Sequence, residues 1–288
     1  MGPALSSNAS WQAGTMRDLG AMFTLYWTQA FYDGLRSHGE TDIMMLPRAG
    51  WVGTWRHGGV LWSGDIGTTM DVLKGQMNIG LSAQMSGIPW WTTDIGGYAG
   101  GRAEDPTYHE IIVRWFQYGV TCPLFRQHGD RDHTAPWYYG NETEKILVDI
   151  IRLREELKPY ISNQLDLLSS IARPFNRPLM WDFPEDRKTW ELAENGLGDS
   201  PGRENGQVEQ VSGVADQYMM GDGYMVAPVL NLKQRSRQVY FPKGATWRHY
   251  FTKKIYAGGS TAVVDVPLES FALFKRLYPE DLPVEKIV

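Results

Sequence analysis

Two short segments of this chain each place one aspartate beside tryptophan and small residues. The first is LWSGD at residues 61–65, and the second is IPWWTTDIGGY at residues 88–98. Indole faces pack on the apolar C–H face of a pyranose ring, and carboxylates accept sugar hydroxyls or transfer a proton to a glycosidic oxygen. Asp65 and Asp94 therefore suggest that the chain handles carbohydrate. Glycoside cleavage, however, usually needs two catalytic carboxylates.

Local sequence leaves a structural alternative open for each aspartate. Asp65 could be a general acid, or it could cap the helix that starts near Thr68. Asp94 could accept two sugar hydroxyls, because the glycines that follow it let the backbone approach a ligand closely. It could equally form a turn.

Two further segments carry polar candidates. Arg48 could hold a carboxylate by a bidentate contact, or it could be an ordinary arginine on a surface loop. His128 lies in the segment FRQHGDRDH at residues 125–133, where two histidines and two aspartates invite comparison with a metal site. Their spacing matches neither zinc nor EF-hand signatures. A sugar-binding histidine is the simpler interpretation, so we predict no metal and no other cofactor.

Helices and strands alternate through the first two thirds of the chain. Apolar residues at helical spacing predict helices over residues 16–36, 69–86, 108–118 and 144–161. Short apolar runs predict strands over residues 42–46, 89–93, 122–125 and 178–183. This order indicates a parallel sheet with crossover helices, hence an α/β fold.

The polar candidates all follow predicted strands. Arg48, Asp65, Asp94 and His128 each come just after an apolar run. In a (β/α)8 TIM barrel the active site lies at the C-terminal ends of the strands, so these side chains should meet at one face. The first two thirds of the chain contain only about four or five strand–helix units, whereas a complete barrel has eight. We therefore expect the later strands of a partial barrel.

The pattern changes after a Gly- and Glu-rich stretch at residues 191–213. β-branched and aromatic runs at residues 224–230, 238–241, 246–251 and 261–266 are separated by Gly and Pro turns. They predict a small antiparallel all-β domain. We expect the barrel part to span residues 1–217 and the β domain to span residues 218–288.

Composition excludes several classes of protein. The net charge of −5 provides no basic stripe for nucleic acid, and no apolar run approaches the roughly 20 residues of a membrane span. Residues 1–14 lack the apolar stretch of a secretion signal, so we expect a soluble protein. The sequence predicts no particular cellular compartment. The single cysteine, Cys122, permits no intrachain disulfide, and its apolar neighbours predict a buried thiol. Nucleotide-binding and serine-hydrolase motifs are also absent from the sequence.

Taken together, the motifs resemble glycoside hydrolase family 31, the retaining α-glucosidases and α-xylosidases. The resemblance includes Arg48, WSGD at 62–65, NIGL at 78–81, IPWWTTDIGGY at 88–98, RWFQYG at 114–119, FRQHG at 125–129, DQYMMGD at 216–222 and MVAPV at 225–229. These segments occur in the family's order and are spread over most of the chain. Tyr98 replaces the phenylalanine usual in the family.

The resemblance implies roles for individual residues. Asp65 corresponds to the catalytic acid/base, and Arg48 to an arginine that holds the sugar and the catalytic carboxylates. Asp94 and His128 correspond to residues beside the bound sugar, and Trp62 would line the subsite. Trp91 and Arg126 lie within the matched segments, and we expect them to contact the substrate as well.

One expected residue is missing. The family's nucleophilic aspartate lies on an earlier barrel strand, whereas Asp18 and Asp33 fall on a predicted helix and Asp42 precedes a strand. The chain thus resembles the C-terminal part of a family 31 enzyme. A retaining mechanism places nucleophile and acid/base about 5 Å apart.

The sequence therefore predicts part of a retaining α-glycosidase that acts on terminal α-linked sugars of an oligosaccharide or glycoside. An α-xylosidase is favoured, with an α-glucosidase as a close alternative. The competing hypothesis is a truncated, inert sugar-binding chain. A half-barrel would also expose sheet edges and apolar helix faces, so we expect self-association.

Overall fold

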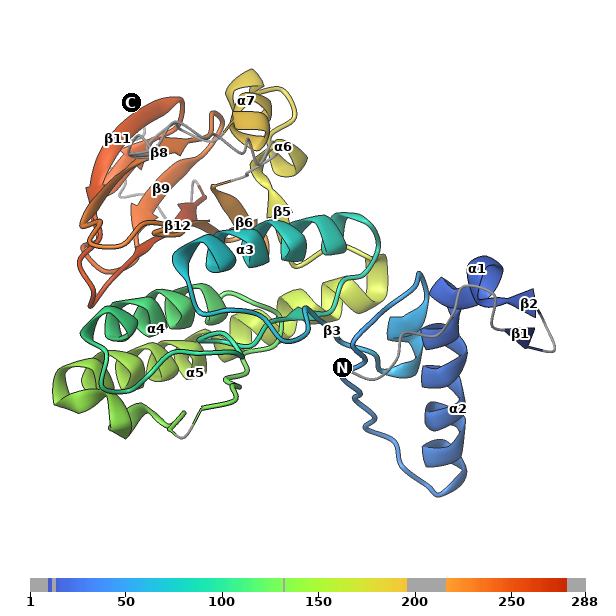
Figure 1. The fold of residues 1–288 in the computed structure, drawn as a ribbon. Helices are drawn as coiled ribbons and strands as arrows, with labels where there is room; N and C mark the ends of the chain where they lie inside the picture. The colour runs from blue at the N-terminus through green and yellow to red at the C-terminus, as the bar shows by residue number, and fades with distance from the viewer. Residues whose placement is uncertain (1–9, 12–13, 132, 196–215, 279–288) are drawn as a thin grey trace.

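The computed structural model describes residues 10–11, 14–131, 133–195 and 216–278. An antiparallel sheet lies at one end of the molecule, long helices lie at its centre, and the N-terminal helices stand apart from both (Figure 1). The site predicted above falls in the central part. Of the Gly- and Glu-rich stretch at residues 191–213, residues 191–195 are helical and the rest lie outside the described residues.

Parallel pairing links four consecutive segments of the central part. Strand β3 (Leu61–Trp62) pairs in parallel with β4 (Trp91–Thr92). Isolated parallel bridges join Met45 to Gly59 and Ile95 to Gln127. The expected strands at 42–46 and 122–125 are thus reduced to single bridges and loop contacts, although the parallel order is as predicted.

Three helices follow these segments. Two of them begin at a polar cap: in α3 (Met70–Met85) the Thr69 side chain accepts a hydrogen bond from Val72 N, and in α4 (Pro106–Gly119) Asp105 accepts one from Thr107 N. Helix α5 (Gly140–Ile171) extends beyond the predicted range at both ends. It buries one stripe, formed by Ile146, Leu147, Ile150, Leu153, Leu157 and Ile161. The helices predicted from apolar spacing are therefore confirmed.

The N-terminal part differs in detail from the single helix expected at 16–36. A short hairpin, β1 (Ser10–Trp11) with β2 (Gly14–Thr15), precedes α1 (Met16–Leu19), a 3-10 turn η1 (Gly20–Met22) and α2 (Phe23–Ser37). Helix α2 contacts chiefly the 3-10 turn η2 (Thr54–His57). Its apolar side chains Phe23, Tyr26 and Phe31 are about half exposed.

The C-terminal part is built from antiparallel sheets. One sheet has the strand order β10-β9-β12-β7-β6-β5, and a second pairs β11 with β8. The strands are β5 (Asn176–Pro178), β6 (Tyr218–Met220), β7 (Tyr224–Ala227), β8 (Ser236–Phe241), β9 (Thr246–His249), β10 (Ile255–Ala257), β11 (Ser260–Asp265) and β12 (Ala272–Leu277). The antiparallel β domain predicted from the sequence is present.

The strand expected at residues 178–183 was wrong in extent and in partner. Strand β5 ends at Pro178, and the short helices α6 (Leu179–Asp182) and α7 (Arg187–Asn195) follow. Moreover, β5 pairs antiparallel with β6, so it belongs to the C-terminal sheet rather than to the parallel segments. The domain boundary after residue 217 stays a prediction.

A buried arginine joins the central helices to the C-terminal sheets. Arg114 of α4 has a fully buried side chain and donates hydrogen bonds to the carbonyls of Gln234, Val266 and Pro267. Gln117, one turn further along, donates to the carbonyls of Leu268 and Ser270. These bonds satisfy carbonyls of the C-terminal part, so they fix that part against α4.

Within the described residues, no helix is long and apolar enough to cross a membrane.

Candidate active site

The Asp65 carboxylate forms the first half of the candidate site. It follows β3 and lies 3.4 Å from Arg48 Nη1. Asp65 does not cap the following helix, because Thr69 performs that role. The Asp65 side chain is 41% exposed, which leaves its carboxylate accessible to a bound molecule.

Gly64 explains how Arg48 reaches this position. Gly64 has a φ of +79°, and a Cβ atom there would lie 3.0 Å from Arg48 Nε. Only glycine adopts this backbone conformation cheaply while leaving room for the guanidinium. The glycine of the WSGD motif therefore brings Arg48 beside Asp65.

The second half of the site is the pair of Asp94 and Arg126. Asp94 follows β4 and has a fully buried side chain, and Arg126 Nη2 donates a hydrogen bond to Asp94 Oδ1. Asp94 Oδ2 is buried and makes no hydrogen bond within the described residues. A buried carboxylate oxygen without a donor is costly.

Both arginines lie near the Trp62 ring. The Cζ atoms of Arg48 and Arg126 lie 5.8 Å and 5.3 Å from the centre of the Trp62 ring, both within cation–π range. These contacts connect the Asp65–Arg48 pair to the Asp94–Arg126 pair through one indole. The structure thus brings Arg48, Trp62, Asp65, Asp94 and Arg126 together. Of these, Arg48, Asp65 and Asp94 were predicted to meet because they follow strands.

His128 lies beside this group through Tyr98. The two ring centres are 5.5 Å apart. His128 also acts electrostatically on Asp94, because its charge lowers the pKa of that carboxyl. Burial is the larger effect, and together with the charge of Asp65 it raises the pKa of Asp94 above its ordinary value of 3.8 despite Arg126 and His128.

Trp91 does not join the site. Its side chain is only 1% exposed and belongs to the hydrophobic core with Leu73, Met77 and Leu81 of α3. A Cβ atom on Gly80 would lie 2.5 Å from Trp91 Nε1, which shows how tightly the indole packs against α3. The expectation that Trp91 contacts substrate is therefore corrected, because no face of this ring reaches solvent.

Arg131, which was not singled out from the sequence, ties the site loops together. Its guanidinium donates to the carbonyls of Gly97, Gly100 and His128, and it lies over the ring of Tyr108. Arg131 falls in the polar loop that also holds His128, but Gly97 and Gly100 lie more than 30 residues away. Residue spacing in the sequence therefore did not predict that Arg131 would donate to the carbonyls of Gly97 and Gly100.

Hydroxyl and amide side chains form a hydrogen-bond network at the ends of β3 and β4. Thr93 Oγ1 donates to Gln76 Oε1 at 3.1 Å, and it lies 3.4 Å from Ser63 Oγ. Ser63 and Thr93 are the neighbours of Gly64 and Asp94. This small network therefore links the two motif segments to helix α3.

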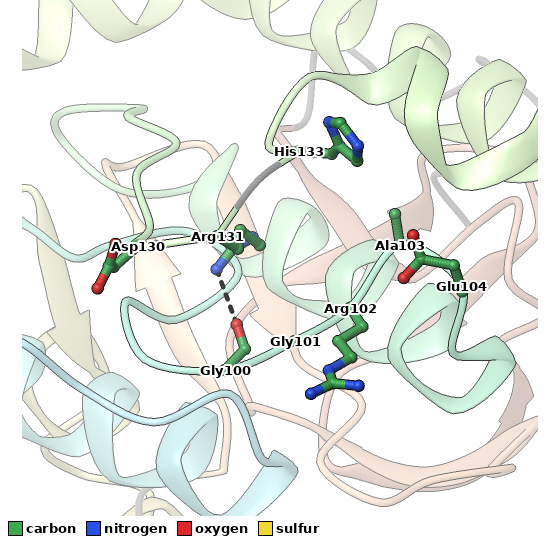
Figure 2. Close-up of a pocket in the computed structure, with 8 residues that line it drawn as sticks. All are labelled: Gly100, Gly101, Arg102, Ala103, Glu104, Asp130, Arg131 and His133. Atoms are coloured by element: carbon green, nitrogen blue, oxygen red, sulfur yellow. Dashed lines mark hydrogen bonds between the residues drawn. The ribbon is translucent and has the colours of Figure 1, made fainter.

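A polar cavity of about 370 Å³ lies between the loop that follows Tyr98 and the loop that follows His128 (Figure 2). Residues 100–104 form one wall, and Asp130, Arg131 and His133 form the other. Neither Asp65 nor Asp94 lines it. Among the described residues, no cluster of three or more His, Cys, Asp or Glu side chains could hold a metal ion.

Sequence profiles decide the family. Residues 3–164 match the "Glycosyl hydrolases family 31 TIM-barrel domain", and residues 172–277 match the "Glycosyl hydrolase family 31 C-terminal domain". The chain belongs to glycoside hydrolase family 31. It is a glycoside hydrolase by family, and its relatives include α-xylosidases and α-glucosidases.

Individual relatives agree with this assignment. An α-xylosidase of Saccharolobus solfataricus is 33% identical over 88% of this chain and 32% of its own length. Alpha-xylosidase A of Aspergillus niger is 29% identical over 97% of this chain and 40% of its own length. The crystal structure of a family 31 α-xylosidase from a soil metagenome, complexed with xylose, superposes with a TM-score of 0.84 at 34% identity, over 95% of this chain and 40% of that chain. The chain thus spans between about a third and two fifths of the length of these curated relatives.

The raised pKa of Asp94 predicts a pH-dependent stability for this family 31 chain. Between pH 3.8 and the higher pKa of the folded state, the fold binds a proton that the unfolded chain does not. The stability that Asp94 contributes should therefore fall as pH rises through the folded pKa. In urea unfolding from pH 4 to 7, the free energy of unfolding of the wild type, relative to Asp94→Asn, should decline as pH rises.

The matched control is Asp149→Asn, whose carboxylate is half exposed on α5. This variant should track the wild type at every pH. If the wild-type free energy of unfolding, relative to Asp94→Asn, stayed constant or increased with pH, the raised pKa of Asp94 would be contradicted.

Proposed function

We propose that this chain is the acid/base-bearing part of a retaining α-glycosidase that removes terminal α-linked sugars. The observation that carries the proposal is the joining of the Asp65–Arg48 and Asp94–Arg126 pairs around Trp62. An accessible carboxylate, a buried carboxylate with a free oxygen and an indole face are the groups that a sugar subsite requires.

In this proposal each residue has a separate task. Asp65 protonates the leaving glycosidic oxygen and later takes a proton from water. Arg48, 3.4 Å away, holds the Asp65 carboxylate in place and faces the sugar. Asp94 Oδ2 accepts sugar hydroxyls, Arg126 balances the charge of Asp94, and His128 contacts a hydroxyl.

The proposal places the nucleophile outside residues 1–288. Among the described residues, the two carboxylates in the arginine pairs around Trp62 are Asp65 and Asp94. Asp94 is buried and bound to Arg126, so it is poorly placed to attack an anomeric carbon. A third carboxylate from elsewhere in the full protein would complete the catalytic pair with Asp65.

Hydrolysis of 4-nitrophenyl α-xyloside and α-glucoside tests the proposal. We expect the chain extended by its upstream coding sequence to hydrolyse these substrates with retention of configuration, so that the first-formed sugar detected by NMR is the α-anomer. Faster cleavage of the xyloside would support the α-xylosidase assignment, which rests on similarity to α-xylosidases. Release of the β-anomer first would overturn the retaining mechanism.

A second candidate is a sugar-binding chain without activity of its own. It is favoured by one observation, namely that no other described carboxylate pairs with Arg48 next to Asp65. The two candidates differ when the chain is compared with a form extended by the coding sequence upstream of Met1. Turnover by the extended form that is lost in Asp65→Asn would support the acid/base-bearing part, whereas sugar binding without turnover in either form would support the second candidate.

We also propose that the isolated chain associates through helix α2. Phe23, Tyr26 and Phe31 expose about half of their side chains on this helix, which stands apart from the rest of the molecule (Figure 1). Replacing Tyr26 and Phe31 by serine should lower the average mass in sedimentation velocity. As a control, Val263→Ser removes a 63% exposed side chain on β11 and should leave the mass unchanged. A monomeric wild-type chain at all concentrations would contradict the proposal.

A further inference from the structure

The loop after β4 lies beside the loop that carries His128, and backbone hydrogen bonds join the two. Ile95 N donates to the Arg126 carbonyl at 3.2 Å, and Asp130 N donates to the Tyr98 carbonyl at 2.9 Å. These bonds lie before and after His128 in the sequence, and neither of them holds the backbone of His128 itself.

The guanidinium of Arg131 adds a connection at His128. Arg131 Nη1 donates to the carbonyls of Gly97 at 2.7 Å and Gly100 at 3.3 Å. Figure 2 shows the bond to Gly100. Arg131 Nη2 donates to the carbonyl of His128 at 3.3 Å. Because Gly97 and Gly100 belong to the loop after β4, one charged side chain holds both loops.

Two glycines leave the space that this guanidinium occupies. A Cβ atom on Gly129 would lie 2.5 Å from Arg131 Cζ, and a Cβ atom on Gly96 would lie 2.7 Å from Arg131 Nη2. Either Cβ would be too close for an ordinary contact, so a side chain at these positions would displace the guanidinium. Each loop thus contributes a glycine that makes room for Arg131.

Tyr108 of α4 supports the guanidinium from below. Arg131 Cζ lies 5.4 Å from the centre of the Tyr108 ring, within cation–π range. The Tyr108 side chain is only 1% exposed, and burial raises its pKa above the ordinary value of 10. The phenol therefore keeps its proton, and Oη donates to the Gly96 carbonyl at 2.8 Å. The position of Arg131 is thus fixed to the hydrophobic core as well as to the loops.

We propose that Arg131 is a positioning residue of the sugar site and that it acts through His128. Its bond to the His128 carbonyl sets the backbone of that residue, and its bonds to Gly97 and Gly100 set the loop that carries Tyr98. The rings of His128 and Tyr98 lie 5.5 Å apart where these loops meet. The inference rests on the proposed function, in which His128 contacts a sugar hydroxyl. It adds a residue that holds this contact in place without touching the sugar.

Sugar binding by the 288-residue chain tests the proposal, because binding does not depend on turnover. NMR titration gives the dissociation constant of xylose or glucose, whichever binds more tightly. Arg131→Met removes all donors and should weaken binding about tenfold, the effect of one lost polar contact. Arg131→Lys restores the charge and should recover part of the affinity. The control Arg102→Met removes an exposed arginine nearby and should keep wild-type affinity.

Gly129→Ala tests the same contact while Arg131 is retained. Gly129 lies outside the left-handed region, so alanine adds only a methyl group, which pushes the guanidinium aside. This variant should weaken sugar binding as Arg131→Met does, and the two changes together should weaken it no further than either alone. Near-UV circular dichroism checks that each variant keeps its fold. If Arg131→Met does not fold, Gly129→Ala and Arg131→Lys decide the outcome.

A double-mutant cycle with His128→Ala separates positioning from a merely structural role. If Arg131 acts through His128, Arg131→Met should change affinity by less than about twofold once His128 is alanine. An equal loss in both backgrounds would overturn the proposal. Wild-type affinity in Arg131→Met and Gly129→Ala, beside weakened binding in His128→Ala, would also overturn it and would leave the proposed function standing.

Asp94→Asn shows whether the proposed function itself fails. Unchanged binding in His128→Ala together with weakened binding in Asp94→Asn would overturn the role of His128, and the positioning role of Arg131 with it, but would keep the sugar site. Unchanged binding in both variants would overturn the proposed function at its own subsite. A chain that binds neither xylose nor glucose would contradict both proposals.

Discussion

Replacing Asp65 by asparagine is expected to slow hydrolysis of an α-glycoside by about 10²- to 10⁴-fold, the usual contribution of a positioned general acid/base. Asparagine keeps the size of the side chain and an oxygen that Arg48 can contact at the present 3.4 Å position. It has no proton to give to the leaving oxygen. The loss should therefore come from chemistry and not from a change in fold.

The leaving group makes this prediction specific to proton donation. A 4-nitrophenolate leaves with little help, whereas a sugar alcohol needs protonation as its bond breaks. Asp65→Asn should thus lose more activity on an oligosaccharide than on the aryl glycoside. The measurement uses the 288-residue chain and, in parallel, the chain extended by its upstream coding sequence.

Asp71→Asn provides the matched control, because Asp71 lies in the first turn of the neighbouring helix α3. It should keep wild-type rates on both substrates. An equal loss on both substrates in Asp65→Asn would argue against an acid role. Unchanged turnover in Asp65→Asn would remove this residue from the mechanism.

The largest effect on stability is expected from Arg114→Met. The Arg114 side chain is fully buried, and burial lowers its pKa to about 10, so it still carries its charge at pH 7. Methionine fills a similar volume but leaves the carbonyls of Gln234, Val266 and Pro267 without their donor. Breaking a buried charged network of this kind costs about 3–5 kcal/mol of unfolding free energy.

Urea unfolding should also become less cooperative in this variant. Arg114 belongs to α4, whereas its carbonyl partners belong to the C-terminal part, so its loss should separate their unfolding transitions. Arg152→Met is the control, since Arg152 is 74% exposed and pairs with Asp149 within its own helix. Its effect should stay within about 0.5 kcal/mol. A loss of similar size in both variants would mean that Arg114 does not join the two parts.

Much of the helical structure follows from local rules. Helices α3 and α4 begin at Thr69 and Asp105, whose side chains accept the free backbone N–H groups of the first turn. In helix α5, apolar residues at helical spacing mark the face that is buried. Caps and apolar spacing depend on residues that are close together in the sequence, so they can be recognised in a single sequence. The strand-end placement of Asp65 and Asp94 follows in the same way from the alternation of elements.

Short strands were harder to predict. Residues 178–183 were predicted as a strand because they are largely apolar, but the chain becomes helical at Leu179. Strand β5 lies one step earlier and pairs with β6, some 40 residues away. A strand of three residues owes its existence to that partner more than to its own composition.

By itself, the sequence determined the family, the order of most elements and the residues that could do chemistry. The tertiary structure decided which of them act together. Trp62 lies within cation–π range of two arginines, whereas Trp91, only one strand away, is packed into the core against Gly80. Arg126 pairs with Asp94, while Arg114 from another motif holds two parts of the fold together. The physical reason is that burial and charge pairing depend on which segments pack side by side, and this is fixed only when distant parts of the chain meet.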